Sequence, residues 1–209
     1  YPSNLNSDKR KINKKKVNIL YLPSMKEIFP SKRIKRIKAS SKSNKLCGKF
    51  RKGHFDGVVT VLKSLFEQVS PNITFFGEKD FQQILIIKDL IFKYKLKIKV
   101  NILRTVRENN GLAFSSRNLL LDKKQKKIAP FLFKIIKEIS FKAKKNLKQL
   151  NNLKLKGKKK LINLGFNKID YLEIYNENNL LKKDIKKNNL RVFVAAYLGK
   201  TRLIDNYKS

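Results

Sequence analysis

The 209-residue sequence has one cysteine, one histidine and few acidic residues. A single cysteine, Cys47, excludes an internal disulfide and a cysteine-rich zinc site. The single histidine, His54, leaves no obvious Ser-His-Asp arrangement for covalent catalysis. No apolar run is long enough to cross a membrane, no signal peptide is visible, and no G-x-x-x-x-G-K-[ST] phosphate loop occurs. Because 41% of the residues are hydrophobic, we expect a globular protein with a real core. The lack of a visible signal peptide favours a cytoplasmic protein.

The shortage of acidic residues leaves an extreme charge: 51 Lys and Arg against 15 Asp and Glu give a formal net charge of +36. Such an excess suggests nucleic-acid binding, because phosphate neutralisation drives affinity whatever the base sequence. The lysines are nevertheless spread almost evenly among apolar positions. We interpret the charge as a drift of surface positions toward Lys and Asn, with non-specific polyanion binding as a consequence. The densest basic segment, residues 31–55, is either a nucleic-acid arm or an exposed connector containing a strand.

Strand and helix patterns alternate through the first part of the chain. The predicted strands are residues 17–23 and 73–76, both expected to be buried, and residues 96–106. The predicted helices are residues 57–69 and a segment starting at Phe81. This alternation is typical of an α/β fold, in which a parallel sheet carries helices on its faces.

The second part has a different character. It contains a long helical pattern at residues 126–145 despite Pro130, and a weaker one at 153–166 interrupted near Gly157. Three strands are expected at residues 171–176 and within 191–206, the last two joined by a Gly199-Lys200 hairpin turn. These patterns predict two domains, residues 1–118 and a small α+β domain at 119–209.

The residues G-E-K-D, 77–80, lie between a predicted strand and a predicted helix. Gly77 marks a point where the backbone bends or approaches another group closely, and Asp80 is a candidate N-cap. Parallel sheets bind ligands beyond their strand C-termini, where helix N-termini offer N–H groups to anions. The stretch is therefore placed to hold a phosphate compound, although an ordinary turn with solvated charges explains it equally well.

A second polar cluster follows the next strand. Ser115, Ser116 and Arg117 come after an Asn-Asn-Gly turn, and two hydroxyls beside a guanidinium make a compact anion cradle. The triplet S-S-R is common in loops and usually carries no function. Its position, after the strand next to the one that ends in G-E-K-D, favours a shared phosphate site.

Three separated segments, GHFDGVVTVLKSLFEQVSPNITFFGEKDFQQ, GLAFSSRN and AAYLGKTRLIDN, together resemble the pantothenate synthetase (pantoate–β-alanine ligase) family. The resemblance runs essentially from Tyr1 to Asn206. It implies a Rossmann-like domain of the adenylating nucleotidyltransferase type, incomplete at its N-terminus, with residues 31–55 as a connector. It also implies an ATP-dependent ligase that joins pantoate to β-alanine through pantoyl adenylate and releases AMP and pyrophosphate. Mg²⁺ accompanies the ATP, and the family is usually a homodimer.

The resemblance assigns site residues by position. The implied ATP contacts are Gly77, Glu78, Lys79, Asp80, Val106, Phe114, Ser115, Ser116 and Arg117. Lys79 is directed to the phosphates, Asp80 to the ribose, and Val106 to the adenosine through its backbone, while Gln83 corresponds to a pantoate ligand. The implied catalytic residues are Lys79, Ser115, Ser116 and Arg117, and no metal-ligating residue is assigned. These assignments agree with electrostatics, because cations placed next to the α-phosphate and the leaving pyrophosphate lower the energy barrier to adenylation.

The chain departs from the family pattern because it lacks the H-x-G-H motif whose histidines bind the ATP phosphates. Its one histidine, His54, lies on the connector, where we expect a structural or interfacial role. We interpret the chain, which starts at Tyr1, as part of a longer enzyme and expect negligible turnover from these 209 residues alone. The alternatives are a decayed non-catalytic remnant, a basic nucleic-acid-binding module, and another nucleotidyltransferase of the same superfamily. Gln83, placed for a small hydroxy acid, argues against the last of these.

Overall fold

The computed structural model describes residues 5–30 and 35–208, and the chain divides into two compact units, Tyr1–Lys35 and Arg36–Ser209. Tyr1, where the family resemblance begins, and residues 31–34 of the basic segment lie outside the described residues. The helices of the first unit are α1 (Leu5–Asn13) and α2 (Met25–Ile28). Neither helix buries a residue.

The strand predicted at residues 17–23 is not formed. These residues have no regular secondary structure, and their apolar side chains are exposed, Ile19 to 83%. A strand needs a neighbour that satisfies its backbone hydrogen bonds, and residues 5–30 contain no strand that could supply one. The strand considered for the basic segment is also absent from residues 35–55, which form η1 (Ser41–Asn44) and α3 (Leu46–Phe50) instead.

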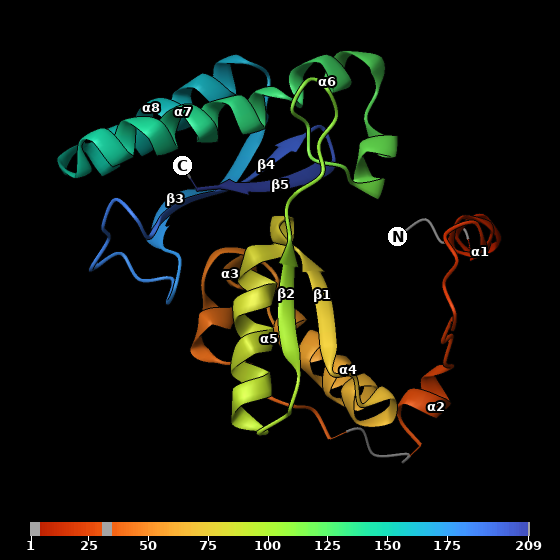
Figure 1. Cartoon of the computed structure of the whole chain (residues 1–209). Helices are drawn as coiled ribbons and strands as arrows, with labels where there is room; N and C mark the ends of the chain where they lie inside the picture. Colours follow the sequence, from red (N-terminus) through yellow and green to blue (C-terminus); the bar gives the residue numbers. More distant parts are fainter. Residues whose placement is uncertain (1–4, 31–34, 209) are drawn as a thin grey trace. The chain divides into compact units, whose positions relative to one another are not determined.

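The predicted α/β pattern is present in the second unit as a parallel pair of strands with helices (Figure 1). Its elements are α4 (His54–Val69), β1 (Ile73–Gly77), η2 (Glu78–Asp80), α5 (Phe81–Lys93) and β2 (Lys99–Leu103). The two strands pair in register from Ile73 opposite Lys99 to Gly77 opposite Leu103. Both strands therefore end at the same edge, as the sequence predicted.

Only one face of β1 is covered within the described residues. Phe76 packs against a buried cluster with Phe81 and Leu85, whereas Phe75 is 58% exposed. Successive side chains of a strand point to opposite faces, so this alternation is what a sheet covered on one side produces. The strand predicted at residues 73–76 is therefore present, but the expectation that it is buried is wrong.

The remaining chain forms a three-stranded antiparallel sheet with a helical layer (Figure 1). Its elements are η3 (Ser116–Leu120), α6 (Lys123–Ile128), α7 (Phe131–Lys145), η4 (Leu147–Gln149), α8 (Leu150–Asn163), β3 (Lys168–Asn176), β4 (Leu190–Leu198) and β5 (Thr201–Tyr207). The strand order is β3-β4-β5, and the predicted hairpin turn at Gly199 is confirmed, with φ of 56°.

Two helix predictions for this part need correction. The single helix expected at residues 126–145 is two helices, because Pro130, which lacks an N–H and favours a helix start, precedes the first residue of α7. The helix α8 continues through Gly157 without interruption. A Cβ at Gly157 would lie 2.5 Å from Ile139 Cδ1 and 2.7 Å from Leu172 Cδ2, so this glycine permits close packing of α8 rather than a break.

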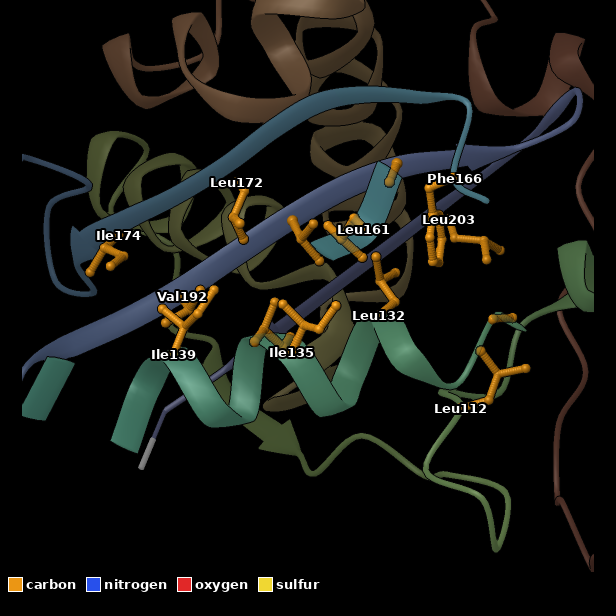
Figure 2. Packing of buried hydrophobic residues seen from close by; sticks show 14 of the residues in the cluster. Leu112, Leu132, Ile135, Ile139, Leu161, Phe166, Leu172, Ile174, Val192 and Leu203 are labelled. Atoms are coloured by element: carbon orange, nitrogen blue, oxygen red, sulfur yellow. The ribbon is translucent and has the colours of Figure 1, made fainter. Parts of the chain in front are cut away.

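Strand β4 is the centre of the second unit because both of its faces are buried. Val192 and Val194 pack with α7 and α8, in a cluster that includes Ile135 and Ile139 (Figure 2). On the opposite face, Phe193 packs with residues of α3, α4 and α5. The antiparallel sheet is thus a middle layer that supports the turn at the end of β1. Among residues 5–30 and 35–208, none of the helices combines the length and the apolarity that crossing a bilayer requires.

Candidate functional site

The turn after β1 presents the G-E-K-D residues at the edge of the parallel sheet. Gly77 has φ −73° and ψ 130°, an extended conformation open to any residue, and nothing lies within 4 Å of a Cβ built on it. Asp80 is the N-cap of α5, but its side chain makes no capping hydrogen bond. The structure thus corrects both the steric role predicted for Gly77 and the capping role predicted for Asp80. The Asp80 carboxylate is left for another role.

The backbone of this turn is held by the last strand, β5. Asn206 Nδ2 donates to the carbonyl oxygens of Glu78, at 2.9 Å, and Lys79, at 3.0 Å. The Glu78 carboxylate accepts a hydrogen bond of 2.9 Å from Arg191, whose guanidinium lies 3.9 Å from the centre of the Phe81 ring. The position of Lys79 therefore depends on a residue 127 positions further along the chain.

The segment after β2 folds back as a short hairpin that leads into the S-S-R triplet. Arg107 and Ala113 form an antiparallel bridge on either side of the Asn-Asn-Gly turn. Ser115 Oγ then accepts a hydrogen bond of 3.3 Å from the backbone N–H of Arg117, at the start of η3. The Arg117 guanidinium donates to the carbonyl oxygen of Arg202 at 3.2 Å. This second loop is thus also held by β5.

The two loops meet at a small cavity of about 10 Å³. Lys79 from the first loop and Ser115 and Arg117 from the second line its wall, together with Arg202 and Asp205. Three cationic side chains beside a hydroxyl donor make a site suited to an anion. The predicted convergence of the two loops is therefore present in the geometry.

Lys79 also lines a larger cavity of about 50 Å³. Its polar and charged lining residues are Cys47, Arg51, His54, Lys79, Asp80, Gln82, Gln83, Tyr171, Asp205 and Asn206. Cys47 Sγ and the Tyr171 hydroxyl lie 3.0 Å apart, and burial is the main cause that raises the pKa of Tyr171. The structure brings Gln83 and Asp80 to this cavity together with Lys79.

Five of the residues assigned by resemblance line neither of these two cavities: Gly77, Glu78, Val106, Phe114 and Ser116. Val106 and Phe114 are 68% and 59% exposed, and the Phe114 N–H donates to the Val106 carbonyl oxygen at 3.0 Å. They form an exposed apolar pair on the hairpin that carries Ser115. Glu78 is committed to Arg191, so its carboxylate supports the turn.

Sequence reasoning missed several residues that shape the site. Arg202, Asp205 and Asn206 all belong to β5, and the available signal was a run of polar residues inside an apolar strand. Asn118 follows the S-S-R triplet and lines the small cavity, and its Oδ1 is buried and has no hydrogen-bond partner in the structure as described. Arg51 lines the larger cavity and precedes His54 by three positions in the predicted connector.

The pKa of His54 is affected by the cationic residues around this site. Burial is the main cause that lowers its pKa from the ordinary value of 6.5, and the charges of Arg51, Arg117 and Arg202 lower it further, while Asp80 opposes them. His54 is therefore neutral at pH 7. Since the unfolded chain binds this proton more readily, the contribution of His54 to stability is present above pH 6.5 and is lost as the pH falls below it.

We expect an NMR titration of the folded chain to give His54 a pKa below 6.5. The Hε1 signal needs no assignment, because the sequence has a single histidine. Arg117→Gln should raise this pKa by removing a nearby positive charge, and Asp80→Asn should lower it by removing the opposing carboxylate. A pKa at or above 6.5 in the unmodified chain would contradict the arrangement of charges described above.

These features together define an α/β protein with a cavity lined by cationic side chains at the end of a parallel sheet. Within the described ranges, no group of three or more His, Cys, Asp or Glu side chains is arranged to hold a metal ion. A family model described as pantoate-beta-alanine ligase matches residues 1–208. The chain belongs to this family.

Curated relatives and solved structures agree with the family. The chain is 38% identical to pantothenate synthetase from Methylobacillus flagellatus, over 99% of this chain and 74% of the relative. It is 39% identical to the Buchnera aphidicola enzyme, over 100% and 74%. The crystal structure of pantothenate synthetase from Thermus thermophilus matches the whole chain and 75% of its own length, with a TM-score of 0.89 and 31% identity. A Francisella tularensis ligase complexed with beta-gamma ATP and β-alanine matches with a TM-score of 0.79 and 32% identity, over 100% and 71%.

Proposed function

We propose that this chain contributes part of the active site for the ATP-dependent condensation of pantoate with β-alanine to pantothenate, which proceeds through pantoyl adenylate and releases AMP and pyrophosphate. The observation that carries the proposal is the meeting of Lys79, Ser115 and Arg117 at one cavity in a member of the ligase family. The Francisella relative supports the substrate class, because its structure contains an ATP compound and β-alanine.

The reaction needs no nucleophile from the protein. A carboxylate oxygen of pantoate attacks the α-phosphorus of ATP, and pyrophosphate leaves with the electron pair of the broken P–O bond. The amine of β-alanine then attacks the acyl carbon, loses a proton, and displaces AMP. Negative charge develops on the phosphate oxygens in the first step, so we assign Lys79 and Arg117 to stabilise it, with Ser115 and Ser116 as donors.

The remaining roles follow the family pattern and the two cavities. We assign Asp80 to the ribose and Gln83 to pantoate, since both line the larger cavity beside Lys79. We assign the exposed pair Val106 and Phe114 to the adenosine side of the site. Gly77 and Glu78 contribute through the position of the turn, because the Glu78 carboxylate is bound to Arg191.

We propose that Mg²⁺ enters with the triphosphate. Mg²⁺ in nucleotide sites is held mainly by substrate phosphates and water, with one or two carboxylates at most. That arrangement fits the absence, within residues 5–30 and 35–208, of a ready cluster of three metal-ligating side chains. The ion would neutralise part of the charge on the leaving pyrophosphate, and Lys79 and Arg117 would supply the rest.

We also propose the family's homodimeric assembly, a cytoplasmic location, and a division of the chain into domains 1–118, with the connector at 31–55, and 119–209. Membership of the ligase family supports the first two, and the separate parallel and antiparallel sheets support the third. Size-exclusion chromatography with light scattering tests the assembly directly, since a single-chain mass would contradict it.

The function is tested by AMP release from the full gene product. We expect AMP only when ATP, pantoate and β-alanine are all present, because the adenylate needs the amine to release AMP. Release of AMP without pantoate, or at a rate independent of β-alanine, would contradict the proposal. In the 209-residue chain, ATP should raise the pKa of His54, because bound phosphates add negative charge near it.

The competing interpretation as a basic nucleic-acid-binding module predicts a different result. Its affinity for DNA or RNA would fall steeply with salt, and ATP would not compete. The charge of +36 supports non-specific binding of this kind alongside the ligase activity. Nucleic-acid binding together with a complete lack of AMP formation would favour the module.

A further inference from the structure

Two neighbouring residues of β5 hold the two loops of the proposed site. Asn206 donates to the carbonyl oxygens of Glu78 and Lys79 at 2.9 and 3.0 Å. Asp205 accepts from Arg107, at the base of the second loop, through both carboxylate oxygens at 2.6 and 3.0 Å. One strand therefore fixes the first loop with one side chain and the second loop with the next.

The alternation of a β-strand explains how one strand reaches two loops. Leu203 belongs to the cluster beneath α7 and α8, whereas Ile204 packs against the cluster of α3, α4 and α5. Side chains two positions apart share a face, so Asp205 lies on the first side and Asn206 on the second. The antiparallel sheet lies between these two layers, which places β5 between the elements that carry the loops (Figure 1).

Every polar atom of the two side chains is already engaged within the protein. Asn206 Oδ1 accepts from Arg191 at 2.6 Å, and both Asn206 donors are used by the turn. The Asp205 oxygens are taken by Arg107 and, at 2.8 Å, by the Asn206 N–H. Both residues are 4% exposed, so an unpaired atom here would be costly. Neither side chain has a free atom for a substrate.

Arg107 connects Asp205 to the second loop through hydrogen bonds. Its guanidinium also donates to the Gly111 carbonyl oxygen at 3.1 Å and lies 3.6 Å from the centre of the Phe133 ring. Gly111 belongs to the Asn-Asn-Gly turn, with φ of 97°, and precedes Ser115 closely in the sequence. Asp205 thus holds the hairpin from which the S-S-R triplet starts.

We propose that Asp205 and Asn206 are positioning residues that set the separation of Lys79 from Arg117 and so align both cations on the triphosphate. The inference rests on the proposed function and deepens it. Misplacement of a catalytic group by about 1 Å can cost about 10²-fold in rate. The clamp formed by Asp205 and Asn206 therefore acts on adenylation, in which the triphosphate reacts, more than on the transfer of the pantoyl group to β-alanine.

The test compares the two half-reactions in the full gene product: pyrophosphate exchange for adenylation, and the reaction of supplied pantoyl adenylate with β-alanine for transfer. Asn206→Asp keeps the acceptor for Arg191 but replaces the donors to Glu78 and Lys79. Asp205→Asn keeps the shape but removes the charge opposite Arg107. In each variant we expect adenylation to slow by about 10-fold to 100-fold and transfer by less than about 3-fold.

Asn189→Ala is the matched control. It removes an asparagine that also bonds two backbone groups, the Asp184 carbonyl oxygen and the Lys186 N–H, in the loop between β3 and β4. Both half-reactions should be unchanged in this variant.

Equal losses in the two half-reactions, no loss, or unfolding of both clamp variants at room temperature would overturn the proposal, because a clamp predicts a folded but misaligned site. Absence of adenylation in the unmodified protein would instead overturn the proposed function.

Discussion

Replacement of Lys79 by alanine is expected to lower the rate of AMP release by about 10²-fold to 10³-fold. Lys79 lies in the wall of both cavities, one of which is also lined by Arg117 and the other by Gln83. As the adenylate forms, charge builds on the α-phosphate and the leaving pyrophosphate, and a fixed ammonium stabilises that charge without reorganisation. Because the charge is greatest in the transition state, kcat should fall more than KM for ATP rises.

A second lysine serves as the control for this variant. Lys200 lies in the exposed hairpin turn between β4 and β5 and lines neither cavity. Lys200→Ala removes the same formal charge from a chain of net charge +36, so it corrects for the general effect of lowering the positive field. AMP release that is unchanged by Lys79→Ala, or equally reduced by Lys200→Ala, would count against the assigned role.

The two loops of the site could be predicted from sequence because their signals are local. Each has polar or charged residues directly after a strand pattern, and the parallel pairing of β1 and β2 brings both strand ends to one edge. Local pattern also predicted the hairpin at Gly199, since a glycine between two β-rich runs favours a turn. The family resemblance then added Gln83, which local pattern alone would have left as one polar residue on a helix.

The clamp residues could not be predicted because their partners are remote in sequence. Asn206 reaches Lys79 across 127 positions, and Asp205 reaches Arg107 across 98. A propensity argument sees Asp205 and Asn206 as weak points in a strand, since both residue types are depleted in sheets. Burial against the two loops overrides that preference.

The strand predicted at residues 17–23 failed for a related reason. Its apolar residues fit a strand, but strand formation depends on a neighbour, and the described part of the first unit contains none. The same limit explains Phe75, which the pattern counted as buried although more than half of its surface is exposed. Periodicity predicts which residues share a face, and the tertiary structure decides which face is covered.

The second large effect is expected on stability, from Arg202→Leu. Arg202 Nε donates to the Asp170 carboxylate at 2.7 Å, and the Asp170 side chain is 2% exposed. Its other oxygen is buried without a hydrogen bond in the structure as described. Removing the guanidinium leaves the buried carboxylate with only the exposed Lys168 ammonium near it, and we expect the free energy of unfolding to fall by about 3–5 kcal/mol.

Two further variants distinguish the effect of the unpaired Asp170 charge on stability from the effect of lost packing. Lys168 is the other cation near the same carboxylate, at 3.9 Å, but its side chain is 63% exposed, so Lys168→Leu should cost less than about 1 kcal/mol. Asp170→Asn added to Arg202→Leu removes the charge that the single change left unpaired. Urea unfolding should therefore show the double variant to be more stable than Arg202→Leu by about 0.5–3 kcal/mol. The Arg202 guanidinium also packs against Tyr171, 5.9 Å from the ring centre, and Cys47, 3.7 Å from the sulfur. A double variant less stable than the single one would mean that Arg202 stabilises the fold through this packing rather than through the buried carboxylate.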